Sequence, residues 1–248
     1  MRRHAAATFL SPELTQIEHA RGAMPLENPS GVFAYYGYNN DGPMLPAPGA
    51  VQAPGANVEA TKTEPDKNVY LVLANQHGGD TRYDYGKRFL FQGHESGVKD
   101  PSTGQKMGYV TRINLDADGA HRVTLLASQD MQGKSLPVFD GITWNPQAQR
   151  LLLTAENGKA GGVWEATADY PSVVKDLSGS MGRGGYEGIQ TDSAGNIWIV
   201  EDAGGASGKV NKNAKQANSF VYRFVPKDKH DLTQGGKLQA LQVMSLAT

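Results

Sequence analysis

The chain reads DGITWNPQAQRLLLTAEN from residue 140 and EGIQTDSAGNIWIVED from residue 187, and the two stretches follow one pattern. Each has an acid before Gly-Ile, a short β-prone run, a tight turn, a second apolar run and a closing Glu. The first acid precedes the closing Glu by 16 residues in the first copy and by 14 in the second. A β unit that repeats after about 45 residues is typical of a propeller blade.

Each copy is followed by two more segments of strand character, and an earlier unit has similar parts. The later segments are 162–166 and 172–175 after the first copy, and 219–225 and 238–243 after the second. The earlier unit contains the apolar run 68–75 and a hairpin of 108–114 with 121–127, separated by an insertion at 81–107. The sequence therefore predicts an all-β, propeller-like fold of about three four-stranded blades, or half of a six-bladed propeller.

The first 67 residues have a different character. Ser11-Pro12 resembles a helix N-cap followed by proline, and Gly22 could end a short N-terminal helix. Residues 45–67 are rich in Pro, Ala and Gly without a period, which predicts an irregular segment. We therefore expect an N-terminal helix and irregular segment over 1–67, and a single domain of blades over 68–248.

Three blades are too few to close a propeller, because closed propellers have about four to eight. An open set of blades leaves apolar faces in water. We therefore expect either a missing C-terminal half or self-association.

Composition argues against several classes of partner. Lys and Arg number 24 and Asp and Glu number 25, so the net charge of −1 does not favour nucleic acid. No apolar run approaches the length of about 20 residues that spans a bilayer. The positive start Met1-Arg2-Arg3 is followed by too short an apolar run for an export signal, so no signal peptide is predicted.

Acids recur at strand ends in successive predicted blades, which would bring them to one face of the disc. Carboxylate oxygens in such a group could hold a hard cation such as calcium. The candidate metal ligands are Asp140, Glu156, Glu187, Glu201 and Asp202, with Asn75, His77 and Asn157 as neutral partners. Any single one of these acids could instead be a solvated turn residue that bonds its own backbone.

Arg183 lies in the glycine-rich stretch 182–187, where the backbone could approach a ligand closely. A guanidinium beside metal-bound carboxylates suits an anion such as phosphate, which it can bind through two parallel hydrogen bonds. The alternative is an exposed arginine in a surface turn.

At these residues the chain resembles the PhoX-type bacterial alkaline phosphatases, a family of metal-dependent β-propeller phosphatases. Segment 36–41 is similar to an early family motif, and 73–77 is similar to its Asn-His-Glu segment. Segment 140–157 resembles the stretch that ends in Thr-x-Glu-Glu-Asn, and 182–187 resembles Gly-Arg-Phe-x-His-Glu.

The resemblance implies a periplasmic or secreted enzyme that hydrolyses phosphate monoesters at a cluster of calcium and iron. It implies that Glu156, Asn157 and Glu187 contact metal or phosphate. The chain has no cysteine where the family ligates iron, near Asp140, so Fe³⁺ loses a ligand and calcium is favoured. The family's histidine is replaced by Tyr186, and its later Arg-Pro-Glu-Asp motif does not occur.

The predicted function is hydrolysis of small phosphate esters at a calcium site, with Arg183 and Asn157 as the catalytic candidates. A second hypothesis is a calcium-dependent propeller esterase or lactonase of the phytase-like or gluconolactonase-like kind. A third is a propeller that serves as a binding scaffold without catalysis, because one fold hosts many functions.

Overall fold

The structure is a computed structural model that describes residues 11–37, 64–95, 97–100, 103–203, 219–242 and 244. Strands account for 38% and helices for 5%, which confirms the predicted all-β class. The helical elements of the described residues are short: α1 (Ser178–Met181) and the 3-10 turns η1 (Gly158–Ala160) and η2 (Leu232–Gln234). Among these residues no helix is long and apolar enough to cross a membrane.

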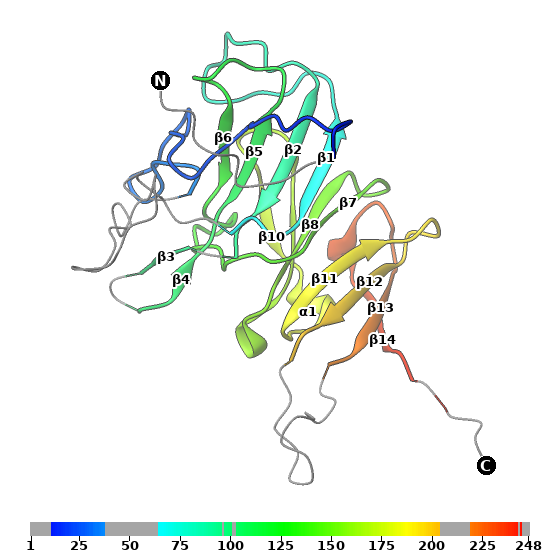
Figure 1. The fold of residues 1–248 in the computed structure, drawn as a ribbon. Helices are drawn as coiled ribbons and strands as arrows, with labels where there is room; N and C mark the ends of the chain where they lie inside the picture. Colours follow the sequence, from blue (N-terminus) through cyan, green and yellow to red (C-terminus); the bar gives the residue numbers. More distant parts are fainter. Residues whose placement is uncertain are drawn as a thin grey trace.

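Three antiparallel sheets of four strands make up most of the molecule (Figure 1). The first sheet contains β1 (Asn68–Val72), β2 (Arg88–Gly93), β5 (Val110–Asn114) and β6 (Val123–Ala127). The second contains β7 (Ile142–Asn145), β8 (Arg150–Ala155), β9 (Gly162–Ala166) and β10 (Val174–Asp176). The third contains β11 (Tyr186–Thr191), β12 (Ile197–Glu201), β13 (Val221–Pro226) and β14 (Gly236–Ala240). In each sheet, neighbouring strands follow one another in chain order, apart from the hairpin inserted between β2 and β5.

The predicted four-stranded units over the second and third sheets are confirmed, and the first unit needs one correction. Its second strand, β2, lies inside the segment 81–107 that the sequence predicts as an insertion. That segment also contains a small hairpin of β3 (Val98–Lys99) and β4 (Lys106–Met107). Strand β2 is short, and the long loop before it separates it from β1, so its membership of the repeat is hidden.

The sheets pack face to face and form two apolar cores. The second sheet lies between the other two, and its strand β8 contributes to both cores. Leu151 and Leu153 belong to the core between the first and second sheets, and Leu152 belongs to the core between the second and third sheets. All three side chains are fully buried. Successive side chains of a strand point to opposite faces, so a strand buried on both faces needs a continuous apolar run.

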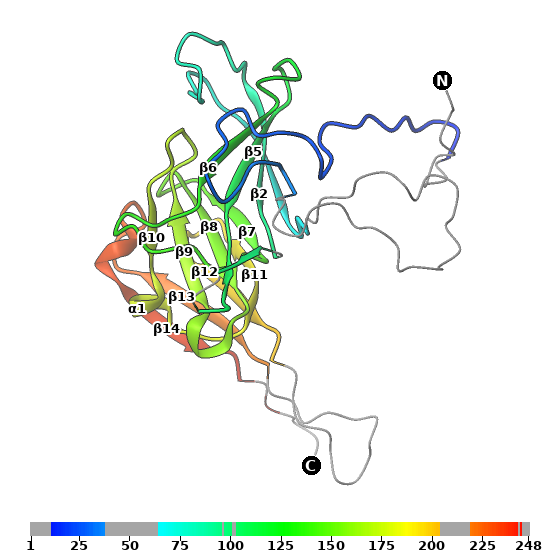
Figure 2. The same cartoon turned by 90° about the vertical axis from the view of Figure 1, so that its left-hand side faces the viewer.

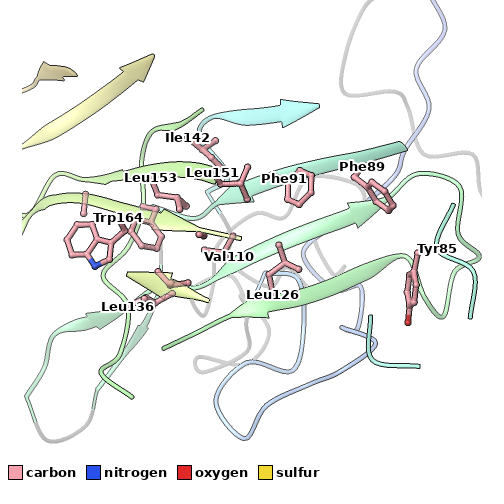
Figure 3. Close-up of a cluster of buried hydrophobic side chains, with 14 residues drawn as sticks. Tyr85, Phe89, Phe91, Val110, Leu126, Leu136, Ile142, Leu151, Leu153 and Trp164 are labelled. Carbon is pink, nitrogen blue, oxygen red and sulfur yellow. The ribbon is translucent and has the colours of Figure 1, made fainter. Parts of the chain in front are cut away.

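The core between the first two sheets runs from Tyr85 at one end to Leu136 and Trp164 at the other (Figure 3). Strand β7 contacts both β1 and β11, so the first strands of the three sheets lie side by side (Figure 1).

The later part of the N-terminal segment, residues 20–37, covers the outer face of the first sheet, and the residues before it run away from the sheet (Figure 2). Leu26, Phe33 and Tyr36 are buried there. The predicted helix from Ser11 to Gly22 is wrong, since these residues form only turns and extended chain. The apolar side chains of this segment do not pack against a core: Leu14 and Ile17 are 59% and 69% exposed. Without such packing, an isolated helix of this length is unstable in water.

The outer face of the third sheet differs from that of the first. Val200, on the outer face, is 44% exposed. Arg223 lies over the ring of Trp198, with 5.7 Å between the guanidinium carbon and the ring centroid. Self-association through an apolar face stays a prediction.

Candidate metal centre

Six carboxylates meet at one edge of the three sheets, and each sheet supplies two. One acid lies at the start of the first strand of its sheet: Asp66 and Asp140 just before β1 and β7, and Glu187 within the first residues of β11. The other follows the second strand: Glu95, Glu156 and Asp202. In an antiparallel pair, the start of one strand and the end of the next lie at the same edge. We call these six residues the acidic cluster.

The acidic cluster contains three overlapping groups of possible metal ligands. These are Asp66 with Asp140 and Glu187, Glu95 with Asp140 and Glu156, and Glu156 with Glu187 and Asp202. Within each group, one oxygen of each carboxylate lies within 4.8 Å of the others. Calcium–oxygen distances are about 2.3–2.6 Å, so oxygens at this separation can share one cation. A cation is therefore geometrically possible in each group.

Asp140 is the most buried member of the cluster. Asp140 is only 3% exposed, and its Oδ1 has no hydrogen-bond partner among the described residues. Burial raises the pKa of Asp140 to about 8, and a hydrogen bond with Asp66 and the charges of Asp66, Glu95 and Glu156 act in the same direction. A buried carboxylate oxygen without a partner is costly unless a proton or a cation compensates it.

The pKa values of two neighbouring carboxylates, Glu156 and Glu95, are raised as well. Burial raises the pKa of Glu156, and the charges of Asp202 and Glu187 add to the effect. Burial likewise raises the pKa of Glu95, and the charges of Glu64 and Asp66 add to the effect. Like charges that are held together at an edge of the fold favour protonation or cation binding.

A buried threonine ties the second and third sheets together at the cluster. Thr154 Oγ1 accepts a hydrogen bond from the Gly141 N–H at 3.0 Å and donates one to the Glu187 carbonyl at 2.7 Å. Gly141 permits this approach, since a Cβ there would lie 2.1 Å from the Glu187 carbonyl oxygen. The acid-Gly-Ile pattern thus has a structural role, because only glycine lets the two acid-bearing segments meet.

A cavity of about 530 Å³ adjoins the cluster, and we call it the first cavity. Its lining includes Glu156 and Asp202 of the cluster together with Glu201, Lys159 and Arg183. Arg183 donates through Nη2 to Asp176 Oδ2 at 3.0 Å and through Nη1 to the Gly161 carbonyl at 3.3 Å. A volume of this size suits a small molecule. Its charged lining has two cations and three carboxylates, so an anionic ligand would also need a cation in the acidic cluster.

The structure brings four of the five predicted metal ligands into the cluster: Asp140, Glu156, Glu187 and Asp202. Glu201 lines the first cavity instead, and its Oε2 accepts a hydrogen bond from the Tyr222 hydroxyl at 3.1 Å. Arg183 also lines the first cavity. Asn157 lines a different cavity on the other side of η1.

Asp66 and Glu95 belong to the cluster although the sequence did not identify them as ligands. The signal that could have found them is the position of the acids, at the start of the first strand and after the second strand of each sheet. His77 was expected as a neutral partner but lies at the opposite edge, where its Nδ1 is 2.6 Å from Asp169 Oδ2. Asn75 precedes it in the same loop after β1. The run 68–75 contains β1, the first strand of its sheet, so the residues after it lie at the edge opposite the cluster.

Comparison with protein-family models and with curated proteins finds no match for this chain. Of the motif 36–41 that resembles the phosphatase family, residues 38–41 lie outside the described residues. The irregular segment predicted over 45–67 is likewise described only from residue 64.

Proposed function

We propose that the chain is a calcium-dependent phosphomonoesterase built on a propeller-like arrangement of blades. The observation that carries this proposal is the unpartnered, buried Oδ1 of Asp140 at the centre of six converging carboxylates. The charge of Lys106 partly opposes the raised pKa of Glu95, but the three ligand groups consist of carboxylates, and a divalent cation would supply further positive charge.

The propeller-like arrangement is supported by the internal repetition of the sheets. Each has four antiparallel strands, and the first strands β1, β7 and β11 are neighbours. Each sheet also brings two acids to the same edge. Repeated units with an equivalent residue at the same place are a known way to build a central site in such folds.

Calcium is favoured over iron by the donor set. The three groups of possible ligands contain only carboxylates, which suit hard cations such as calcium. Among the described residues near the cluster, His94 is fully buried and its Nε2 lies 2.9 Å from Thr111 Oγ1. A bound divalent cation would polarise a phosphoryl oxygen and offset the negative charge of the substrate.

The phosphate group is assigned to the first cavity. Lys159 and Arg183 line it beside Glu156 and Asp202, so cationic side chains face the same space as the cluster. Arg183 is held by Asp176 and Gly161, which fixes its orientation while its side chain stays 44% exposed. A guanidinium oriented in advance loses little entropy when it binds an anion.

The decisive test is the release of phosphate from phenyl phosphate with calcium and with a chelator. We expect calcium-dependent release that Asp140→Asn and Glu187→Gln each reduce by at least about tenfold, because each removes a charged ligand. Asp228→Asn serves as the matched control, since Asp228 is an exposed carboxylate in the loop between β13 and β14. Hydrolysis of phenyl acetate or a lactone in place of phenyl phosphate would refute the assigned reaction and support the esterase hypothesis. No hydrolysis at all would support the scaffold.

A further inference from the structure

A second cavity, of about 550 Å³, lies beyond the η1 turn. Its walls come from the β3–β4 hairpin and from the segment 130–137, and its lining includes Trp164 and Asn157. Trp164 and Leu136 lie together at one end of the core between the first two sheets (Figure 3). A volume of this size is typical of a site for a small organic molecule.

The η1 turn is the partition between the two cavities. Glu156 and Lys159 line the first cavity, whereas Asn157 and Ala160 line the second. Adjacent residues of one short turn therefore serve both spaces. A ligand with its phosphate in the first cavity could place its other half in the second without leaving this edge of the sheets.

The lining of the second cavity combines an apolar wall with two lysines. Trp164 is 4% exposed and Leu136 is 1% exposed, and Met107 lies on the hairpin side. Lys106 and Lys134 also line the space. Within the part of the chain that the structure describes, neither ammonium group forms a salt bridge with a carboxylate.

The two aspartates of the lining are occupied by local turns. Asp130 Oδ1 accepts hydrogen bonds from the backbone N–H groups of Gln132 and Lys134, each at 2.9 Å. Asp100 Oδ1 accepts one from the Thr103 N–H at 3.2 Å. These carboxylates stabilise the loops that form the walls and keep their negative charge. Lys106 and Lys134 are therefore the groups of the lining that can donate to an anionic ligand, and the charge of Lys106 also acts on Glu95.

We propose that the second cavity binds the alcohol half of the phosphate ester and favours an aromatic or similarly flat group that carries its own negative charge. The apolar wall provides contact area for the ring, and Lys106 and Lys134 provide the complementary charge. The statement that this group is the alcohol half of a phosphate ester rests on the proposed function. The statement that the second cavity binds a flat, negatively charged molecule does not rest on it.

The first experiment measures binding of 4-hydroxybenzoate by calorimetry in the presence of a chelator, so that its carboxylate has no calcium to bind. Phenol is the neutral comparison. We expect 4-hydroxybenzoate to bind at least about fivefold more tightly, and the Lys106→Gln/Lys134→Gln double variant to lose this preference. Lys99→Gln is the control, since Lys99 is an exposed lysine of the same hairpin that does not line the cavity.

The second experiment compares 4-carboxyphenyl phosphate with phenyl phosphate in kcat/KM. Wild type should favour the carboxylated ester through a lower KM, and the double variant should hydrolyse both esters about equally. Equal binding of 4-hydroxybenzoate and phenol by wild type, or a preference that survives in the double variant, would overturn the assignment. Lysine-dependent binding without any phosphate release would support the ligand class of the cavity and refute the proposed reaction, so the two failures are distinct.

Discussion

Replacing Thr154 by valine should loosen the contact between the second and third sheets at the acidic cluster. Thr154 is fully buried, and its hydroxyl is shared between the Gly141 N–H and the Glu187 carbonyl. Valine has nearly the same shape, so the substitution removes the two hydrogen bonds without opening a large cavity. The backbone groups of Gly141 and Glu187 would then lose this partner inside the fold.

The magnitude follows from those two backbone groups. A buried polar group without a partner costs about 1–3 kcal/mol, so we expect Thr154→Val to lower the free energy of unfolding by about 2–4 kcal/mol. Urea unfolding followed by circular dichroism measures this directly, and an unchanged m-value would show that the same surface is exposed in both proteins. Calcium affinity should fall as well, because Glu187 is held in place by the same contact.

Thr143→Val is the matched control for this prediction. Thr143 lies in the same sheet and also contacts the third sheet, where its hydroxyl donates to Gln190 Oε1 at 3.0 Å. Gln190 is exposed, so water can replace the lost bond and the cost should stay below about 1 kcal/mol. A loss at Thr154 no larger than the loss at Thr143 would refute the structural role assigned to Thr154.

Three further outcomes follow from the packing and the charges. Leu152→Ala should lower the free energy of unfolding by about 2–5 kcal/mol in urea, because Leu152 is fully buried between the second and third sheets. Gly141→Ala should destabilise the fold and weaken calcium binding together, which a melt and a calcium titration would detect, since its Cβ would meet the Glu187 carbonyl at 2.1 Å. Burial raises the pKa of Glu165, and the nearby ammonium group of Lys175 only partly opposes this. The stabilising contribution of Glu165 is therefore complete below its unfolded pKa of about 4.3 and is lost as the pH rises through its higher folded pKa. Glu165→Gln should lose less stability than wild type between pH 4 and pH 8, as measured by urea unfolding in a chelator.

The repeat could be predicted from sequence where its period was short. In the second and third sheets the acid at the start of the first strand is 16 and 15 residues from the acid after the second, Asp140 to Glu156 and Glu187 to Asp202. A tight turn joins the two strands in both cases, so the pattern is visible as one block.

The first sheet hides the same pattern because its loop is long. Asp66 and Glu95 are 29 residues apart, and the loop between β1 and β2 separates the two strands. The apolar run after residue 68 is followed by polar residues, as the second strands of the other sheets are, so His77 resembles a ligand position although it lies at the opposite edge. The direction of a strand depends on its partner, which an apolar run alone does not specify.

The second cavity could not be predicted from sequence either. Its lining joins Lys106 of the hairpin, Lys134 of a loop and Trp164 of β9, and these residues meet only through the packing of the first two sheets. Local patterns do identify strands and turns, but they do not identify a space that three separate segments enclose.

The measurement that tests the metal centre most directly is calcium binding by the purified chain, followed by mass spectrometry and by a thermal melt with and without a chelator. A cation that binds only the folded state raises stability by about 2.7 kcal/mol at one hundred times its Kd, or about 5–10 °C for a chain of this size. We expect stoichiometric calcium and a shift of this order that Asp140→Asn abolishes. A chain without bound metal, whose melt is the same in calcium and in chelator, would contradict the cation site.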